Sequence, residues 1–179
     1  MKQVQYNGLT FVPFISKDEI AKRVKEIAAD IKADFDGSVP LFICVLNGAF
    51  PFAADLFRAV DMDAEITFIR LKSYQGTETS GKVKEIVGLS EDIKGRDVII
   101  IEDIVDTGHT LAKLVADLKQ KEPARMKIAT LLFKPDSECN GVKPDYVGFS
   151  IDPRFIIGYG LDLDGMARNL EDIYVLKQD

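Results

Sequence analysis

Apolar residues recur along the chain in two alternating patterns. Residues 17–35 carry apolar side chains three and four positions apart, which predicts an amphipathic helix with Ser16 as its N-cap. Short runs that are apolar throughout, such as PLFICVL, are typical of strands buried on both faces. These patterns predict strands at 40–46, 64–74, 96–101 and 125–133, helices at 49–60 and 110–121, and shorter strands at 145–151, 155–161 and 172–177. The alternation predicts an α/β fold with a central, mostly parallel sheet flanked by helices.

One segment departs from this alternation. Residues 75–96 begin with small and polar residues without apolar periodicity, which predicts a mobile loop with a hairpin, within about residues 74–88. No internal repeat, low-complexity tract or linker divides the chain. We therefore expect a single domain over residues 1–179.

Composition narrows the classes of partner. The chain has 179 residues, 46% of them hydrophobic, which is enough for one continuous core. Its 23 basic and 29 acidic residues give a net charge of -6, which argues against a broad surface for nucleic acid or anionic membranes. The sequence shows no signal-peptide core and no apolar run of the roughly 18 to 20 residues that span a membrane. We expect a cytoplasmic protein with two free thiols, Cys44 and Cys139.

The stretch VIIIEDIVDTGHTLAKLV, residues 98–115, combines the strongest chemical signals. Ligands in open α/β sheets bind beyond the carboxyl ends of the strands, where Glu102 and Asp103 are expected to point into a crevice. The turn Asp106–Thr110 contains a glycine and two threonines and leads into a helix, whose first amides can bind phosphate. The turn alone is equally consistent with a capped helix start and solvated acids.

Taken whole, the stretch resembles the phosphoribosyl pyrophosphate signature of type I phosphoribosyltransferases. Other segments look like corresponding parts of the hypoxanthine-guanine phosphoribosyltransferases, in the same order. They are VLNGAFPFAADL, LKSYQGTETSG, LLFKPD and KPDYVGFSIDPRFIIGYGLD. The resemblance covers most of residues 40–176. It implies the type I phosphoribosyltransferase fold, with a small hood built from terminal segments.

The resemblance also implies an activity. It is the Mg²⁺-dependent transfer of a 5-phosphoribosyl group from phosphoribosyl pyrophosphate to hypoxanthine, guanine or both, giving IMP or GMP and pyrophosphate in purine salvage. The implied partners are these two substrates, without nucleic acid or membrane, and the family favours a homodimer or homotetramer.

Residue by residue, the resemblance assigns roles along one ligand. Asp106 matches the general base that takes a proton from the purine, and Glu102 and Asp103 match the pair at the ribose hydroxyls and metal. The 5′-phosphate would bind at Asp106, Thr107, Gly108, His109 and Thr110. The purine would contact Lys134, Phe155, Ile156 and Asp162, with Lys134 donating to the oxygen at carbon 6 and Phe155 stacking. The pyrophosphate would contact Asn47, Gly48 and Arg168, the metal Asp162, Glu102 and Asp103, and the closing loop would begin at Ser73 and Tyr74.

Two positions depart from the family or stay unassigned by it. The family often has lysine before the glycine of Asn47-Gly48, and the resemblance leads us to expect a cis peptide at that bond. His109, the only histidine, is interpreted as an exposed residue at a helix start rather than a catalytic one.

Competing functions are weaker. The motif DLDG at 162–165 also occurs in haloacid-dehalogenase-like phosphatases, but little chain follows it to complete such a site. The P-loop, dinucleotide and EF-hand patterns are absent from the sequence. The alternative that remains is a nucleotide-sensing regulator with this fold that binds nucleic acid, against which Asp106 and the net negative charge both argue.

Overall fold

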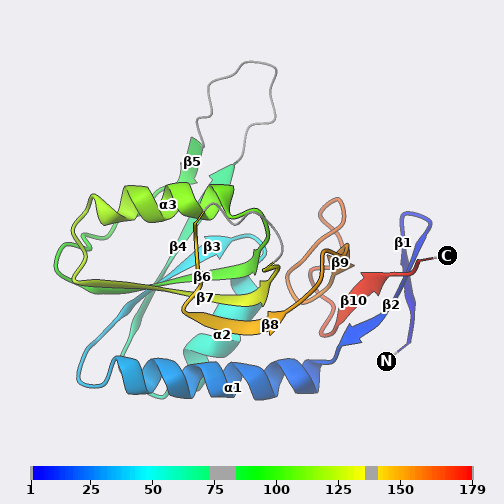
Figure 1. Cartoon of the computed structure of the whole chain (residues 1–179), viewed down its shortest axis with the longest axis horizontal. Coiled ribbons are helices and arrows are strands. Elements are labelled where there is room, and N and C mark those ends of the chain that lie inside the picture. The colour runs from blue at the N-terminus through cyan, green and yellow to red at the C-terminus, as the bar shows by residue number, and fades with distance from the viewer. Residues whose placement is uncertain (1, 73–83, 136–140, 179) are drawn as a thin grey trace.

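The larger of two sheets forms the centre of the molecule (Figure 1). The structure, a computed structural model, describes residues 2–72, 84–135 and 141–178. Six strands lie in the order β5 (Lys84–Val87), β4 (Glu65–Lys72), β3 (Leu41–Leu46), β6 (Asp97–Val105), β7 (Arg125–Phe133) and β8 (Tyr146–Ser150). The five strands from β4 to β8 in this order are parallel, and β5 is antiparallel to β4. The predicted α/β fold with a mostly parallel sheet is confirmed.

Three helices cover the two faces of this sheet. In Figure 1, α1 (Lys17–Asp34) and α2 (Phe50–Ala59) lie on one face and α3 (His109–Lys119) on the other. The alternation of side chains along β6 explains the two cores, since Ile99 and Ile101 pack with α1 and α2 while Val98 and Ile100 pack with α3. Each face of the sheet therefore has its own apolar cluster.

The predicted N-cap of α1 is confirmed. The Ser16 hydroxyl accepts from the Glu19 backbone N–H, and the Glu19 carboxylate accepts from the Ser16 N–H at 2.9 Å. This reciprocal pair fixes the start of α1, whose buried residues are Ile20, Val24, Ile27, Ala28 and Ile31.

A second, four-stranded antiparallel sheet forms the hood at one end of the molecule (Figure 1). Its strands lie in the order β1 (Val4–Tyr6), β2 (Leu9–Ile15), β10 (Ile173–Leu176) and β9 (Ile156–Ile157). The hood is thus built from terminal segments, as the family resemblance implied. Sequence patterns had not predicted β1 and β2. The predicted strand 155–161 is reduced to two residues, because the backbone reverses at Gly158, Tyr159 and Gly160, which have φ of 98°, 47° and 98°.

The bounds of β6 correct one expectation. The strand was predicted to end at residue 101, but it continues to Val105 because its ladder with β7 persists as far as Val105 opposite Phe133. Glu102 and Asp103 therefore lie inside the strand instead of beyond its end. Between β4 and β5, residues 73–83 hold most of the predicted loop and lie outside the described residues.

The order of the strands defines where a ligand can bind. From β3 the chain passes through α2 to β4 on one side, whereas β6 lies on the other side of β3. The connections after β3 and β6 diverge in opposite directions, which leaves a crevice at the carboxyl ends of these two strands. Residues 47–48 follow β3 and residues 106–108 follow β6, so both predicted ligand loops meet there.

Two glycines allow the hood to approach this crevice. A Cβ atom at Gly48 would lie 1.5 Å from Oδ2 of Asp103, and one at Gly160 would lie 2.0 Å from the carbonyl oxygen of Gly48. The turn after β9, the loop after β3 and the carboxylate on β6 are thus stacked in direct contact. No side chain fits between these three layers.

Within the described residues, no helix is long and apolar enough to cross a membrane. Cys44 is a free, buried thiol, as expected, and Cys139 lies outside the described residues.

The stacking predicts a coupled pair of substitutions. Gly48→Ala is expected to lower the free energy of unfolding by about 1–3 kcal/mol, because the added methyl overpacks a filled space. In an Asp103→Ala background the same change is expected to cost much less, since the three atoms nearest the new Cβ all belong to the Asp103 carboxyl group. Urea denaturation of the four proteins measures this coupling, and strictly additive effects would contradict the predicted contact.

Candidate active site

Glu102 and Asp103 are neighbours in β6, but their side chains lie in different surroundings. Glu102 lines a cavity of about 140 Å³ together with residues 104–111. The Asp103 carboxylate lies against Gly48, and its Oδ1 accepts from the Ile104 backbone N–H at 2.8 Å. This divergence follows from the alternation of side chains in a strand. The pair predicted from the sequence therefore reaches both sides of the crevice.

The surroundings of these carboxylates disfavour their negative charge. Burial raises the pKa of Glu102 well above its ordinary value, and the charge of Asp103 raises it further. Burial also raises the pKa of Asp103, although the Ile104 N–H and the Arg168 charge act in the opposite direction. The same field reaches the Cys44 thiol, where burial and then the two acids raise the pKa to about 12. A cation bound beside Glu102 and Asp103 would be favoured by this potential.

The turn between β6 and α3 has the features of an anion site. Gly108 is the N-cap of α3, in the left-handed conformation with φ of 69°, and provides no side-chain cap to the first amides of the helix. The first turn of α3 carries no acidic residue, while the helix dipole places positive potential there. Thr107 and His109 are exposed beside the 140 Å³ cavity, which Thr110 also lines. The predicted phosphate loop thus faces a solvent-accessible hollow, and His109 is exposed at the helix start as predicted.

Asp106 and Lys134 are brought together by the register of β6 and β7. Val105 lies opposite Phe133, so the next residue of each strand is also adjacent, and the Lys134 N–H donates to the Val105 carbonyl at 3.0 Å. The Lys134 ammonium donates to Oδ2 of Asp106 at 2.8 Å. The predicted base contact and the predicted general base therefore form one ion pair in this structure.

Asp162 and Arg168 form a second charged pair, in the loop between β9 and β10. The Arg168 guanidinium lies 2.7 Å from Oδ1 of Asp162 and donates to the Gly160 carbonyl at 2.5 Å. Oδ2 of Asp162 accepts from the Gly165 N–H at 2.7 Å. Because Gly160 also rests on Gly48, this pair is held against the loop that follows β3.

Phe155 and Ile156 differ in exposure. Phe155 is 47% exposed, and its ring centroid lies 6.0 Å from that of the buried Phe11 at an interplanar angle of 45°. Ile156 is buried in β9 opposite Val175. Phe155 thus has an accessible ring surface, whereas Ile156 can offer a ligand its backbone more readily than its side chain.

The remaining predicted positions fall at or outside the crevice. Asn47 is exposed and Gly48 is buried. The cis peptide joins Leu46 to Asn47, so the expected position at the 47–48 bond was wrong by one residue. Ser73 and Tyr74 lie outside the described residues. The described residues contain no cluster of three or more metal-binding side chains.

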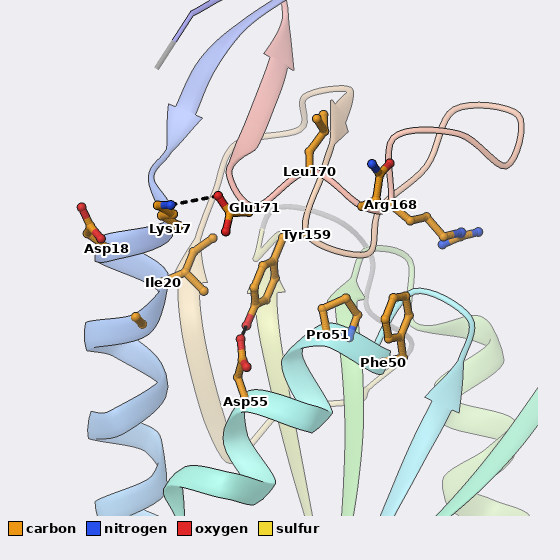
Figure 2. Close-up of a pocket in the computed structure, with 12 residues that line it drawn as sticks. Lys17, Asp18, Ile20, Phe50, Pro51, Asp55, Tyr159, Arg168, Leu170 and Glu171 are labelled. Atoms are coloured by element: carbon orange, nitrogen blue, oxygen red, sulfur yellow. Dashed lines mark hydrogen bonds and ion pairs between the residues drawn. The ribbon is translucent and has the colours of Figure 1, made fainter.

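A different cavity, of about 410 Å³, lies between the N-terminal ends of α1 and α2 and residues 168–171 (Figure 2). Two pairs of its polar groups bind each other, because Lys17 pairs with Glu171 at 2.8 Å and the Tyr159 hydroxyl donates to Asp55 at 2.6 Å. Arg168 also lines it, but the side chain extends away from Lys17 and Tyr159 in Figure 2. The predicted chemistry is therefore concentrated at the smaller hollow.

Two features of the site were missed in the sequence. Gly160 was not singled out, although the GYG motif signals a tight turn and the close approach to Gly48 requires a residue without a side chain. The pairing of Asp106 with Lys134 was also missed. Its signal was that each residue follows a predicted strand of the parallel sheet, while the register that sets them side by side is given by the ladder between β6 and β7.

Comparison with known proteins identifies a family. Residues 16–164 match the family model of the phosphoribosyl transferase domain. The hypoxanthine-guanine phosphoribosyltransferase of Bacillus subtilis (strain 168) is 44% identical over 164 residues, which cover 91% of each chain. A crystal structure of a hypoxanthine-guanine phosphoribosyltransferase from Bacillus anthracis, with a HEPES molecule in its active site, has a TM-score of 0.87 and 40% identity over 93% of this chain and 97% of that one.

A mutant hypoxanthine phosphoribosyltransferase from Trypanosoma cruzi, solved as a ternary substrates complex, has a TM-score of 0.88. It is 36% identical and the match covers 96% of this chain and 97% of that one. The matched residues include the acidic pair on β6, the anion loop and the lysine after β7. This chain therefore belongs to the phosphoribosyl transferase family.

Proposed function

We propose that the protein is a 6-oxopurine phosphoribosyltransferase of purine salvage. It transfers the 5-phosphoribosyl group of phosphoribosyl pyrophosphate to hypoxanthine, guanine or both, and releases IMP or GMP and pyrophosphate. One observation carries the proposal: the open N-terminus of α3 lies directly beside the Asp106–Lys134 pair. A nucleotide carries both a phosphate and a polar base edge, so one ligand can use both. The names of the similar proteins support the same reaction.

The reaction places different demands on the two ends of this site. The bond from the ribose carbon to the pyrophosphate oxygen breaks, and its electron pair leaves with pyrophosphate. A bond to a purine ring nitrogen forms, and the proton on that nitrogen passes to Asp106. Positive charge develops on the ribose ring during this exchange, as in glycoside chemistry. The negative potential of Glu102 and Asp103 would favour that charge where it forms.

The acidic residues fit the Mg²⁺ that the reaction is expected to use. Magnesium is usually held by one or two carboxylates and by substrate phosphates, so it does not require a complete protein cage. Glu102, Asp103 and Asp162 are the carboxylates that would hold it, and the raised pKa of the first two indicates a place where a cation is favourable. Magnesium would neutralise charge on the leaving pyrophosphate.

The remaining contacts divide between base and pyrophosphate. Lys134 would donate to the oxygen at carbon 6, and Phe155 would stack on the base with its exposed ring. The backbone near Ile156 and Asp162 would contact the base edge at carbon 2. The pyrophosphate would lie near Arg168 and the loop after β3, to which Asn47 contributes a neutral side chain. The closing segment would begin at Ser73 and Tyr74, excluding water from the developing cation.

The proposal is tested by mixing the protein with Mg²⁺, phosphoribosyl pyrophosphate and hypoxanthine, guanine or xanthine. We expect the nucleotide and pyrophosphate to appear in equal amounts for at least one base, with loss of activity on chelation. Absence of turnover with every 6-oxopurine, together with tight binding of nucleic acid, would instead support the regulator.

Asp106→Asn tests the general base. The amide keeps the size of the side chain but cannot take a proton, so kcat is expected to fall by about 10²–10⁴-fold while KM for the purine changes much less. Steady-state kinetics with varied purine measure both parameters. A near-normal kcat would remove Asp106 from this role.

Glu102→Gln tests the cost of the buried charge. Because folding raises the pKa of Glu102 above its ordinary value of 4.5, the unfolded chain loses this proton first, and stability falls as pH rises above that value. The amide has no such penalty, so the variant is expected to melt higher than the parent, with a larger gain at about pH 8 than at about pH 5. A gain of about 1 kcal/mol corresponds to roughly 2–4 °C.

The matched control for this comparison is Asp30→Asn, which neutralises an exposed acid on α1. It is expected to leave the melting temperature nearly unchanged at both pH values. Equal effects of the two substitutions would show that the gain reflects net charge and not the position of Glu102.

A further inference from the structure

The pair formed by Lys134 and Asp106 is unusual in its asymmetry. Lys134 is a buried residue, 9% exposed. Its side chain is 11% exposed, whereas that of Asp106 is 48% exposed. A buried ammonium is costly unless a counter-charge accompanies it, so Asp106 stabilises Lys134 in the protein without ligand. A ligand that approaches from solvent therefore meets the Asp106 side chain over a larger surface than the Lys134 side chain.

This pairing affects the reaction proposed above, on which the inference rests. The carboxylate of Asp106 must gain a proton, yet an ammonium 2.8 Å away makes that carboxylate a weaker base. The same ammonium must also donate to the oxygen at carbon 6 of the purine. The Asp106 carboxylate and the Lys134 ammonium are therefore bound to each other before the base binds. The reaction needs the carboxylate to accept a proton and the ammonium to bind the oxygen at carbon 6.

We propose that the oxygen at carbon 6 of the substrate releases Asp106 for proton transfer by drawing the Lys134 ammonium away from it. The oxygen is an acceptor that can replace the carboxylate as partner of the ammonium. The carboxylate, no longer paired with this ammonium, then takes the proton of the ring nitrogen as the bond from that nitrogen to the ribose forms and pyrophosphate leaves. Lys134 is thus a positioning residue for the proton transfer as well as a contact to the base.

Release of Asp106 and simple recognition of the oxygen by Lys134 have different kinetic effects. If Lys134 only recognised the oxygen, a purine with a poorer acceptor at carbon 6 would bind less tightly but react normally once bound. If the oxygen releases Asp106, a poorer acceptor leaves the ammonium on the carboxylate, and kcat falls even at saturation. An amino group, which presents N–H donors to the ammonium, leaves the pair closed. Selection against 6-aminopurines would then reside in kcat as well as in KM.

The experiment measures kcat and KM for a series of bases with different groups at carbon 6: hypoxanthine, 6-thioxopurine and unsubstituted purine. For the parent protein, we expect kcat at saturation to fall by about tenfold or more from hypoxanthine to purine, since a neighbouring opposite charge weakens a carboxylate base by about 1–3 pK units. For Lys134→Met, we expect KM for hypoxanthine to rise, kcat for purine to increase above the parent value, and the spread of kcat to shrink to within about threefold.

Lys127→Met is the matched control. Lys127 lies in β7, the strand that Lys134 directly follows, and its ammonium pairs with Asp145 at the same distance of 2.8 Å. Its removal takes away one lysine–aspartate pair without touching Asp106, so the spread of kcat across the series is expected to stay as in the parent. If Lys134→Met is too unstable for kinetic measurements, Lys134→Gln replaces it. This variant is expected to reduce the spread of kcat across the series in the same way.

The outcomes are distinct. A parent protein that uses none of the 6-oxopurines would overturn the proposed function itself. A parent that uses hypoxanthine but shows equal kcat across the series would overturn the release of Asp106 and leave the function intact. An unchanged kcat for purine in both Lys134 variants would overturn it too, because the lysine would then act on binding alone.

Discussion

The ladder between β6 and β7 is the constraint on which the rest of the site depends. It runs without a shift from Asp97 opposite Arg125 to Val105 opposite Phe133, and the Lys134 N–H extends it by one more contact to the Val105 carbonyl. Parallel strands in register deliver equivalent positions to the same edge of the sheet. A slip by one residue would send Glu102 and Asp103 to exchanged faces and separate Asp106 from Lys134. The apolar residues that fix the register of β6 and β7 therefore also determine which site residues lie side by side.

Much of the large sheet could be predicted from the sequence because its strands are buried on both faces. Runs that are apolar throughout, such as residues 41–46, strongly favour a buried strand. The spacing of Ile20, Val24 and Ile27 specifies the buried face of α1. The hood was harder to predict, since β1 pairs with β2, and β2 in turn pairs with β10 at the far end of the chain. Local patterns carry little information about such distant partners.

In the site too, features within one stretch of sequence were predicted, whereas contacts between distant segments were not. The anion loop and the acidic pair lie within one continuous stretch of sequence, so a single motif identifies them. The sequence prediction ended β6 too early because two consecutive acids are typical of the end of a strand. In the structure, the ladder with β7 continues past Glu102 and Asp103 to Val105. The Gly160–Gly48–Asp103 stack could not be foreseen, because it joins three connections that only the packed fold brings together.

The construction of the hood has a consequence for how the site is completed during synthesis. β2 precedes every strand of the large sheet and β10 follows every one, yet the two are hydrogen-bonded neighbours. During translation, β2 must wait for nearly the whole chain before its partner exists. Phe155 packs on Phe11 of β2, so the surface expected to receive the base forms among the last parts of the molecule. A nascent chain can thus hold a finished phosphate loop well before it can select a base.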